Sequence, residues 1–451
     1  MQTGRFRINA ALKEIIINAG WLFFLRVLRI LLALFVGVWV ARYLGPARFG
    51  TLNYALAFVA LFIPLARLGI DHIAVRDVVR RPEETDLTLG SVFILRLVGG
   101  IASLLLIVFT IRLVRPDDRL TQLMAAIVGF GLIFQAFDAI DIWFQSRVQS
   151  KYVVYARSSG LFLANLLKIV LILTGASLVA FAWISALDMI ATAAALVIVY
   201  RARGFFITRW RFGLRRGLEL LGQSWPLILS GALAVVYLKI DIVMLGQMKG
   251  IETVGIYSTA ARISEVWYFI PVAISVSVFP ALVKGRSLGA RVYRRRLQQL
   301  YDFLVWIALL LAVALTFFAG PLIQLLYGEA YAGAGQILAI HIWAGIFVFM
   351  REAFVRWLTN EGLLHYFLIT NGVGAGLNVV LNLFLIPAYG GTGAAVATVI
   401  SYGAGGYLAC FITPKTRDAG RMMSRALIVP LRAVTGWLGL HEEDGDGAHD
   451  E

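Results

Sequence analysis

Residues 304–319 read LVWIALLLAVALTFFA and carry no charged side chain. With their uncharged flanks they reach the length of about 20 residues that an α-helix needs to cross a bilayer. Residues 97–111 form a second such run, and similar windows recur along the 451-residue chain. Only 15% of the residues are charged, too few to cover soluble domains. The sequence therefore predicts an all-α polytopic membrane protein. It excludes a soluble enzyme with one anchor and an outer-membrane barrel, whose strands would alternate apolar and polar residues.

Twelve transmembrane helices account for the apolar runs. They cover roughly residues 15–41, 49–70, 88–111, 121–145, 152–173, 178–200, 222–246, 253–280, 297–319, 336–358, 363–386 and 392–413. The connections on one side of the membrane hold 28 Lys and Arg, and those on the other side hold 6. Because cationic loops resist translocation, the basic side is cytoplasmic. The count predicts that both termini face the cytoplasm.

The two ends of the chain fit this topology. The first apolar run begins near Ile15 and lacks a small-residue cleavage site, so we expect it to stay as a span rather than be removed as a signal peptide. Residues 414–440 are apolar but interrupted by arginines, which favours a cytoplasmic interfacial helix. Residues 441–451 hold six of the 26 acids and predict a disordered acidic tail.

The composition also limits the chemistry. Cys410 is the only cysteine, which excludes an intrachain disulfide and a cysteine-based metal cluster. We expect no metal site and no cofactor other than a coupling ion, H⁺ or Na⁺. The formal net charge of +15 reflects the basic connections, so nucleic acid is not an expected partner. No Walker A pattern occurs, so we do not expect the chain to hydrolyse ATP.

A weak internal repeat divides the chain into halves. Three features recur in order, Gly45, Gly50 and Pro64 in the first half and Gly246, Gly255 and Pro271 in the second. Their offsets are 201, 205 and 207 residues. Six helices separate the copies, so both copies have the same orientation, as in transporters built from parallel repeats. We expect two six-helix lobes, residues 1–205 and 206–413.

Three segments carry a resemblance to a known family: ARYLGPARFG at 41–50, FQAFDAIDIWFQSRVQSKY at 134–152 and IPAYGGTGAAVATVIS at 386–401. Together they resemble the Wzx-type polysaccharide flippases of the multidrug/oligosaccharidyl-lipid/polysaccharide exporter superfamily. The resemblance covers about residues 1–415. It implies two lobes around a central cavity and alternating access in the bacterial cytoplasmic (inner) membrane. The implied cargo is a polyprenyl-pyrophosphate-linked oligosaccharide for O-antigen or capsule assembly, and the implied partners are membrane lipids, a glycan polymerase and the chain-length machinery.

Basic side chains inside the predicted spans are candidates for binding the cargo, because buried ionisable residues are costly and usually face a cavity. Arg26 and Arg29 lie in the middle of the first span, and their spacing places them on one face. Arginine suits a phosphate because its planar fork donates two parallel hydrogen bonds. Lys239 and Arg262 lie in the first two helices of the second half. We predict that these four residues form a cationic pyrophosphate site; the alternative is that they pair with structural carboxylates.

Two embedded acids, Asp241 and Glu265, are the candidates for ion coupling. A coupling carboxylate must bind H⁺ or Na⁺ in one state and release it in another. Arg262 and Glu265 are spaced i,i+3 and could instead form an ion pair within one helix.

Three asparagines, Asn371, Asn378 and Asn382, form a polar stripe on one predicted helix. Amides hydrogen-bond sugar hydroxyls, so we predict that the stripe contacts the glycan. Hydrogen bonding between packed helices is the alternative.

Other embedded charges have structural interpretations. We expect Arg67, Arg96 and Lys168 to extend toward the membrane surface from near helix ends. Asp138 and Asp141 share a helix face, and they either share a proton or pair with basic residues that follow, Arg147 and Lys151.

Three functions stay open at this stage. A flippase for lipid-linked oligosaccharide agrees best with an embedded charge that is mostly basic. A multidrug/cation antiporter of the same superfamily would need a cavity dominated by carboxylates. A scaffold that holds glycan-assembly enzymes without transport is the third reading. An enzyme is not expected, because the outer connections are too short to hold a catalytic domain.

Overall fold

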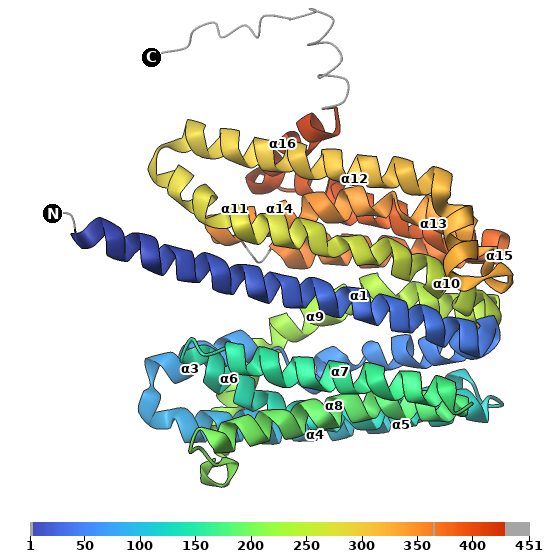
Figure 1. The fold of residues 1–451 in the computed structure, drawn as a ribbon, viewed down its shortest axis with the longest axis horizontal. Helices are drawn as coiled ribbons and strands as arrows, with labels where there is room; N and C mark the ends of the chain where they lie inside the picture. The colour runs from blue at the N-terminus through green and yellow to red at the C-terminus, as the bar shows by residue number, and fades with distance from the viewer. Residues whose placement is uncertain (1–2, 364–365, 429–451) are drawn as a thin grey trace, which may run out of the picture.

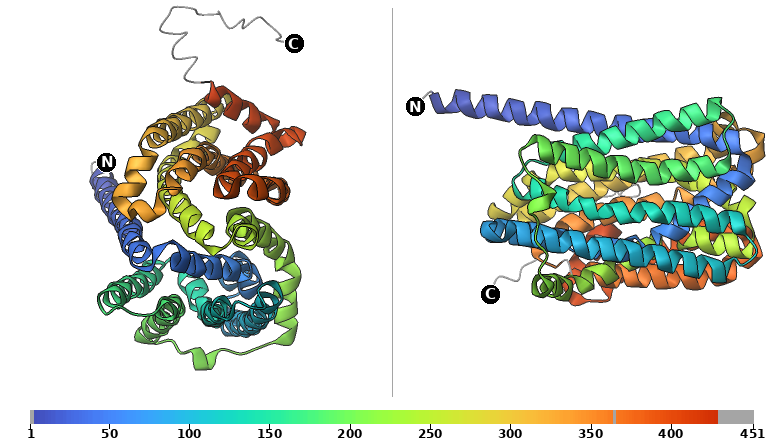
Figure 2. Two further views of the ribbon diagram at one scale, coloured as in Figure 1. Left: turned by 90° about the vertical axis from the view of Figure 1, so that its right-hand side faces the viewer. Right: turned by 90° about the horizontal axis from the view of Figure 1, so that it is seen from below.

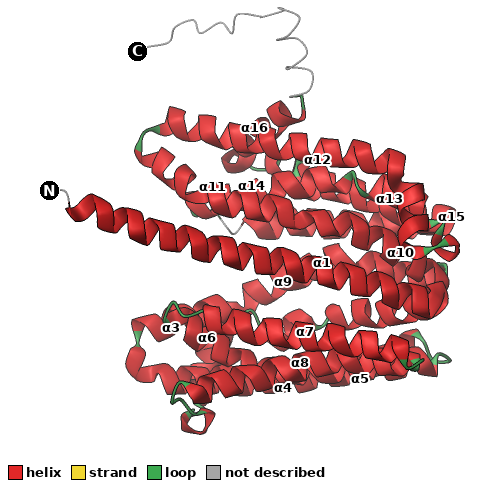
Figure 3. Ribbon diagram, in the orientation of Figure 1, coloured by secondary structure: helices red, strands yellow, loops and turns green. Residues whose placement is uncertain are grey.

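The computed structural model describes residues 3–363 and 366–428, with side chains from Arg29 onward apart from a few between residues 276 and 287. All regular structure in this part of the chain is helical (Figure 3). The long helices run roughly side by side in one direction (Figure 1), and seen end-on they form two groups (Figure 2).

The first half of the chain forms eight α-helices. They are α1 (Thr3–Ala60), α2 (Ile63–Arg67), α3 (Asp71–Arg80), α4 (Thr85–Val114), α5 (Arg119–Gly131), α6 (Ala139–Ser146), α7 (Lys151–Leu173) and α8 (Leu178–Ala202). The second half forms eight more. They are α9 (Leu214–Met248), α10 (Ile251–Glu265), α11 (Phe269–Ser287), α12 (Ala290–Tyr327), α13 (Ala334–His341), α14 (Ala344–Glu361), α15 (Tyr366–Gly406) and α16 (Arg417–Leu427).

Nine helical stretches among the described residues are long and apolar enough to cross a membrane. This number agrees with twelve predicted spans once three features are considered. The continuous helices α1 and α15 each contain two predicted spans, joined at Gly45 and Gly390, and the predicted span 253–280 is divided between α10 and α11. Large apolar side chains such as Leu310, Phe317 and Phe384 are exposed on the outside of the bundle, as expected for a surface that faces lipid.

The two ends of the bundle differ in charge, and we name them accordingly. The basic end carries the arginine-rich connections, including residues 203–213, and α1 begins there, on the left of Figure 1. The opposite end carries the turns at Gly45 and Gly250, whose φ angles are 72° and 88°. Glycine reaches such angles without the steric cost of a side chain. Gly250, rather than Gly246, therefore matches Gly45 in the repeat, and its offset of 205 residues equals that of Gly50 and Gly255.

Helix α9 belongs to both lobes. Leu220 in its first half is buried in the core of the first lobe, and Gly231 lies against Pro64 of α2. Further along α9, Tyr237 stacks on Tyr402 of α15, with ring centroids 4.5 Å apart. The helix therefore crosses from one lobe to the other between Gly231 and Tyr237 (Figure 2). The predicted lobe boundary at residue 206 lies in the connection before this helix.

The short helix α16 is amphipathic, as predicted for this region. Its apolar residues Ala419, Met422, Met423 and Ala426 are buried in a cluster with residues of α12 and α14. The protein itself therefore covers the face that we expected to lie in the membrane interface. Of the predicted interfacial segment, residues 429–440 lie outside the described residues, as does the predicted tail 441–451.

Candidate functional site

The two lobes share one hydrophobic core at the opposite end. Phe49 and Ala55 of α1 belong to the same buried cluster as Val254 of α10 and Ile337 of α13. At the basic end each lobe has its own cluster, one around Trp143 and one around Tyr301 and Met423. The lobes are thus joined at the opposite end and separate toward the basic end (Figure 1).

The closest contact between the lobes is made by two glycines that the repeat relates. A Cβ atom on Gly50 would overlap the carbonyl oxygen of Ile251, and a Cβ atom on Gly255 would overlap the carbonyl oxygen of Pro46. The backbones of α1 and α10 therefore touch at this point. We call this contact the seal. The sequence repeat identified both glycines but not that they meet.

Polar contacts surround the seal. The hydroxyl group of Tyr331 donates a hydrogen bond to the carbonyl oxygen of Ala41, 2.7 Å away. Arg42 donates to the carbonyl oxygen of Leu325 at 2.6 Å, and Arg115 donates to that of Gly246. Each bond joins the two halves of the chain, so the lobes are closed against each other at the opposite end.

Of the predicted cationic residues, Arg262 is the one whose contacts place it between the lobes. The side chain of Arg26 lies outside the described residues. Arg29 is half-buried, and its Nε atom is buried without a hydrogen-bond partner among the described residues. Arg262 of α10 lies against Gly37 of α1, and its guanidinium carbon is 5.5 Å from the ring centroid of Phe49.

The alternative that Arg262 and Glu265 form an ion pair within one helix is not seen in the described structure. Glu265 lies instead 3.8 Å from Lys239 of α9, and both side chains are about a third exposed (34% for Lys239 and 37% for Glu265). An exposed ion pair in a membrane protein faces an aqueous space rather than lipid. The pairing leaves Arg262 without a carboxylate partner in the described structure, so its positive charge stays uncompensated where α10 faces α1. Arg29 of α1 has no carboxylate partner among the described residues either.

Lys168 adds to this charge. It is half-buried on α7 and interacts electrostatically with Arg262 of the other lobe and with Asp188 of α8. We expected Lys168 to extend toward the membrane surface; its interaction with Arg262 places it instead among the cations at the lobe interface. The sequence did not indicate this role of Lys168, because a single sequence does not show which helices face each other.

Asp241 lies at the centre of a buried polar cluster in the second lobe. Its side chain is 4% exposed. Asn382 donates to one carboxylate oxygen at 2.6 Å, while Tyr257 donates to the other at 3.1 Å. The hydroxyl group of Thr398 lies 2.6 Å from that second oxygen. All these partners are neutral.

Three further atoms of this cluster are buried without partners among the described residues: Oδ1 of Asn382, Nδ2 of Asn378 and Nδ1 of His341. Burying a carboxylate without a positive charge is costly. The cluster therefore offers a buried negative charge together with an unused amide oxygen. Sequence reasoning identified Asp241 but missed Tyr257, Thr398 and His341, although Thr398 lies within the segment 386–401 quoted above.

The predicted asparagine stripe is buried. Asn371, Asn378 and Asn382 are each at most 1% exposed. Asn371 accepts a hydrogen bond from Arg351 at 2.7 Å, and Asn382 donates to Asn378 at 3.0 Å. These are the interhelical and local contacts of the alternative interpretation. Contact with a glycan stays a prediction for another conformation.

Buried ion pairs stabilise the interior of the first lobe at the basic end. The side chain of Arg96 is fully buried, so it does not extend to the surface as expected, and it donates to Asp71 at 2.7 Å. Burial raises the pKa of Asp71, but the positive charges of Arg96 and Arg67 lower this pKa by a larger amount. The pKa of Asp71 therefore lies below its usual value.

The acidic pair of the first lobe has a single basic partner. Asp138 and Asp141 each lie 3.0 Å from Arg157 of α7. Arg147 and Lys151, the partners expected from sequence, lie over the aromatic rings of Trp143 and Tyr152 instead.

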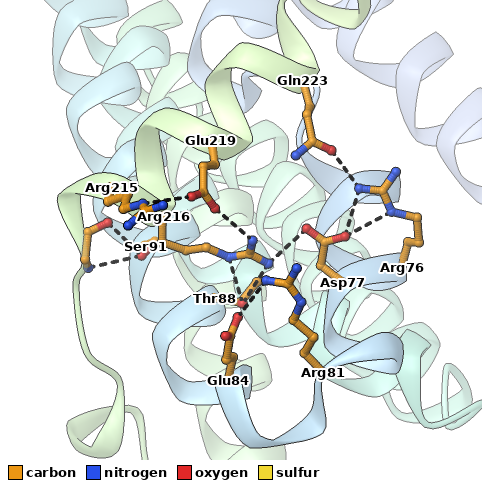
Figure 4. Close-up of polar contacts among 11 residues, drawn as sticks. Arg76, Asp77, Arg81, Glu84, Thr88, Ser91, Arg215, Arg216, Glu219 and Gln223 are labelled. Carbon is orange, nitrogen blue, oxygen red and sulfur yellow. Dashed lines mark hydrogen bonds and ion pairs between the residues drawn. The ribbon is translucent and has the colours of Figure 1, made fainter.

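A second network fastens the first turns of α9 to the first lobe (Figure 4). Arg216 is 7% exposed and lies 2.9 Å from Asp77 of α3. It also donates to Thr88 of α4 at 3.3 Å. Arg76 bridges Asp77 and Gln223, at 2.8 Å and 2.7 Å. The start of α9 is therefore a fixed part of the first lobe.

Comparison with known families connects this architecture to membrane exporters. The profile of the family described as polysaccharide biosynthesis protein matches residues 15–286, and that of the MatE family matches residues 226–384. The probable flippase AglR of Haloferax volcanii is 26% identical over 221 residues, 48% of this chain and 43% of AglR. An uncharacterized membrane protein of Methanocaldococcus jannaschii is 23% identical over 194 residues, 42% of this chain and 37% of that protein. The matched regions span less than half of both relatives.

Solved structures share the fold over most of the chain. The lipid II flippase MurJ in an inward closed conformation has a TM-score of 0.73 at 15% identity, over 95% of this chain and 94% of that one. An inward-facing multidrug resistance transporter of the MATE family has a TM-score of 0.69 at 15% identity, covering 92% and 96%. An outward-facing transporter of that family has a TM-score of 0.57 at 16% identity, covering 90% and 94%.

Proposed function

The chain belongs to the polysaccharide biosynthesis protein family, and on this premise we propose that it is a flippase for a polyprenyl-pyrophosphate-linked oligosaccharide. The observation that carries the proposal is the excess of positive charge between two lobes that are closed at one end only. A pyrophosphate loses its hydration on entering the apolar layer. Guanidinium and ammonium groups positioned between the lobes replace that hydration with charge-assisted hydrogen bonds.

Arg29, Arg262 and Lys239 are the proposed pyrophosphate ligands, with Lys168 as a fourth contributor. Arg29 and Arg262 have no carboxylate partner in the described structure, so they are available for an anion. Glu265 pairs with no base other than Lys239 among the described residues. A phosphate can displace the carboxylate of Glu265 from Lys239. Arg26 lies one helical turn before Arg29 and stays a predicted ligand.

The contrast between the ends supports a mechanism of alternating access. The cargo enters from the basic end, where the lobes have separate cores, and leaves when the seal opens. The basic end is the cytoplasmic one in this proposal, because connections rich in Lys and Arg stay on the cytoplasmic side of a membrane. A cytoplasmic membrane and the polymer types O-antigen and capsule stay predictions.

Asp241 is the proposed ion-coupling residue. Its carboxylate, the free amide oxygen of Asn382 and the hydroxyl group of Thr398 are oxygen ligands of the type that suits a hard cation. H⁺ or Na⁺ would neutralise the buried charge. Glu265 is the weaker candidate, because Lys239 already neutralises it.

A multidrug/cation antiporter is the competing function, and the MatE match over residues 226–384 favours it. An organic cation would require the carboxylates Glu265 and Asp188 to bind cargo. In the structure both acids have basic neighbours, Lys239 and Lys168. The excess positive charge therefore supports an anionic cargo.

The proposal is tested with purified protein in proteoliposomes that contain a fluorescent lipid-linked oligosaccharide. We expect Arg29→Ala and Arg262→Ala each to slow translocation roughly 10- to 100-fold, the value of one or two charge-assisted hydrogen bonds. Arg29→Lys should recover part of the rate, because charge remains while the fork is lost. Arg112→Ala, at an exposed position of the opposite end, is the matched control and should be neutral. Full activity of the Arg29→Ala/Arg262→Ala double variant would contradict the proposal, and transport of organic cations would support the antiporter.

Ion coupling is tested with the same liposomes. A sodium or pH gradient should change the wild-type rate, and Asp241→Asn should abolish that response while the protein stays folded. If wild-type translocation ignores both gradients, Asp241 is a structural residue and the direction of transport is set by consumption of the product.

A further inference from the structure

A groove of about 440 Å³ lies between the first turns of α12 and helix α16 at the basic end, away from the lobe interface. Four arginines line it, two from each helix. The residues that form its polar wall are Arg294, Arg295, Gln298, Asp418, Arg421 and Arg425. The groove therefore brings together basic residues that are more than 120 positions apart in the sequence.

The described residues do not neutralise the positive charge in the groove. Asp418 is the only acid in its lining, and it lies 3.1 Å from Arg294 and 3.5 Å from Arg421. Arg295 and Arg425 have no ion-pair partner among the described residues. Two of the four guanidinium groups thus share one carboxylate, and the other two are unpaired in the described structure. The positive end of the α12 helix dipole lies near the groove and further favours the binding of an anion.

The groove is preformed rather than created by a ligand. Met423 and Ala426 of α16 are fully buried against the bundle, and the backbone of Met422 accepts a hydrogen bond from Gln298 at 3.0 Å. Both walls of the groove therefore belong to one packed unit. Binding an anion there requires ordering of arginine side chains only.

The height of the groove along the bundle indicates which anions reach it. Helix α12 has 38 residues and is about 57 Å long, well beyond the roughly 30 Å of the hydrocarbon core. One exposed apolar side chain, Val292, lies near its start, and a denser run begins at Phe303 and continues through Trp306 and Leu310. Arg294 precedes Phe303 by nine residues, or about 13 Å along the axis. The groove thus lies at the level of the lipid phosphates.

We propose that this groove binds the headgroup of an anionic phospholipid. The phosphodiester would accept hydrogen bonds from Arg295 and Arg425, while Arg294 and Arg421 stay on Asp418. Basic pockets at the cytoplasmic edge of transmembrane helices recognise lipid headgroups in this way. The site is separate from the proposed cargo site, because it lies on the outer side of the second lobe.

The test is a lipid titration of the purified full-length protein in a neutral detergent. Thermal unfolding is followed while phosphatidylglycerol or phosphatidylcholine is added, and native mass spectrometry counts the bound lipids. We expect phosphatidylglycerol, but not phosphatidylcholine, to raise the melting temperature of the wild type. Arg295→Gln/Arg425→Gln should weaken the apparent affinity for phosphatidylglycerol roughly 30-fold, and Arg425→Gln alone about fivefold.

The matched control is Arg80→Gln/Arg201→Gln, which removes the same charge from exposed positions at the same end. It should keep the wild-type affinity. An equal loss in the control would reduce the effect to general surface charge and overturn the proposal, as would unchanged affinity in Arg295→Gln/Arg425→Gln. Sodium phosphate at millimolar concentration is the last arm: stabilisation equal to that by the lipid would show a site for soluble phosphate instead. Arg425→Gln, which removes one exposed side chain, serves if the double variant fails to fold.

Discussion

The two ends of the molecule hold their helices together in different ways. At the opposite end the lobes meet through apolar side chains and a direct contact of backbones at Gly50 and Gly255. At the basic end the described parts of the lobes have separate cores, and the first lobe is stabilised internally by ion pairs of buried arginines such as Arg96–Asp71. Apolar contact is non-directional and can be broken and reformed, whereas a buried ion pair requires fixed geometry. Stiff lobes and a breakable contact between them are what a rigid-body motion that opens the seal requires.

The largest effect is expected where a buried pair at the basic end is broken. Asp71→Asn leaves the fully buried Arg96 without its carboxylate and should destabilise the protein by about 3–5 kcal/mol. Glu84→Gln, which removes the exposed partner of Arg81, should cost at most about 1 kcal/mol. Thermal unfolding in detergent measures both. Equal melting temperatures would mean that the first lobe does not depend on its buried pairs.

The same variant has a pH signature. Because the folded pKa of Asp71 is depressed, its stabilisation is present above the unfolded pKa of about 3.9 and is lost as pH falls through the folded value. The difference in stability between wild type and Asp71→Asn should therefore stay constant from pH 5 to 8.

An intermediate effect is expected at the seal. Gly50→Ala places a methyl group against the backbone of α10 and should cost about 1–3 kcal/mol in the closed state alone. Spin labels at Asp117→Cys and Glu329→Cys, with Cys410 replaced, report the separation of the lobes at the opposite end. We expect Gly50→Ala to lengthen this distance. Gly222→Ala, which has no neighbour within 4 Å in the described structure, should leave it unchanged; the same distance in both variants would show that the glycines do not control closure.

The smallest effect is expected from a single hydrogen bond beside the seal. Tyr331→Phe removes the bond to Ala41 and keeps the ring in place, so closure should weaken by about 0.5–1.5 kcal/mol. The spin-label distance distribution should gain a minor open population. A shift as large as that of Gly50→Ala would place the main closing interaction at Tyr331 and not at the glycines.

The architecture was largely predictable from sequence because membrane spans have long apolar runs and basic connections lie on one side. The helical membrane spans follow from these signals, and the repeat identified the glycines at 50 and 255; the division of the chain at residue 206 stays a prediction. The match of Gly45 to Gly250 could not be predicted, because the Leu-Gly dipeptide at Gly246 resembles the first copy more closely. Only the backbone angles distinguish the two glycines.

The candidate site was predictable as a set of charged residues but not as a set of contacts. Glu265 lies closer in sequence to Arg262 than to Lys239, yet it pairs with Lys239 across two helices. The asparagine stripe has the spacing of a cavity wall, yet its residue Asn382 donates a hydrogen bond to Asp241 on a neighbouring helix. Partners on separate helices depend on helix rotation, and a single sequence contains no signal for that angle.

Helix α9 makes the order of the chain differ from its division in space. Its first turns are fixed to the first lobe by Arg216 and Asp77, while its last turns pack in the second. A gene cut at codon 206 would therefore assign part of one lobe to the other polypeptide. The two fragments could rebuild the protein only by exchanging this helical arm, as subunits do in a domain-swapped dimer. A single reading frame removes that assembly step and keeps the two lobes at a ratio of one to one.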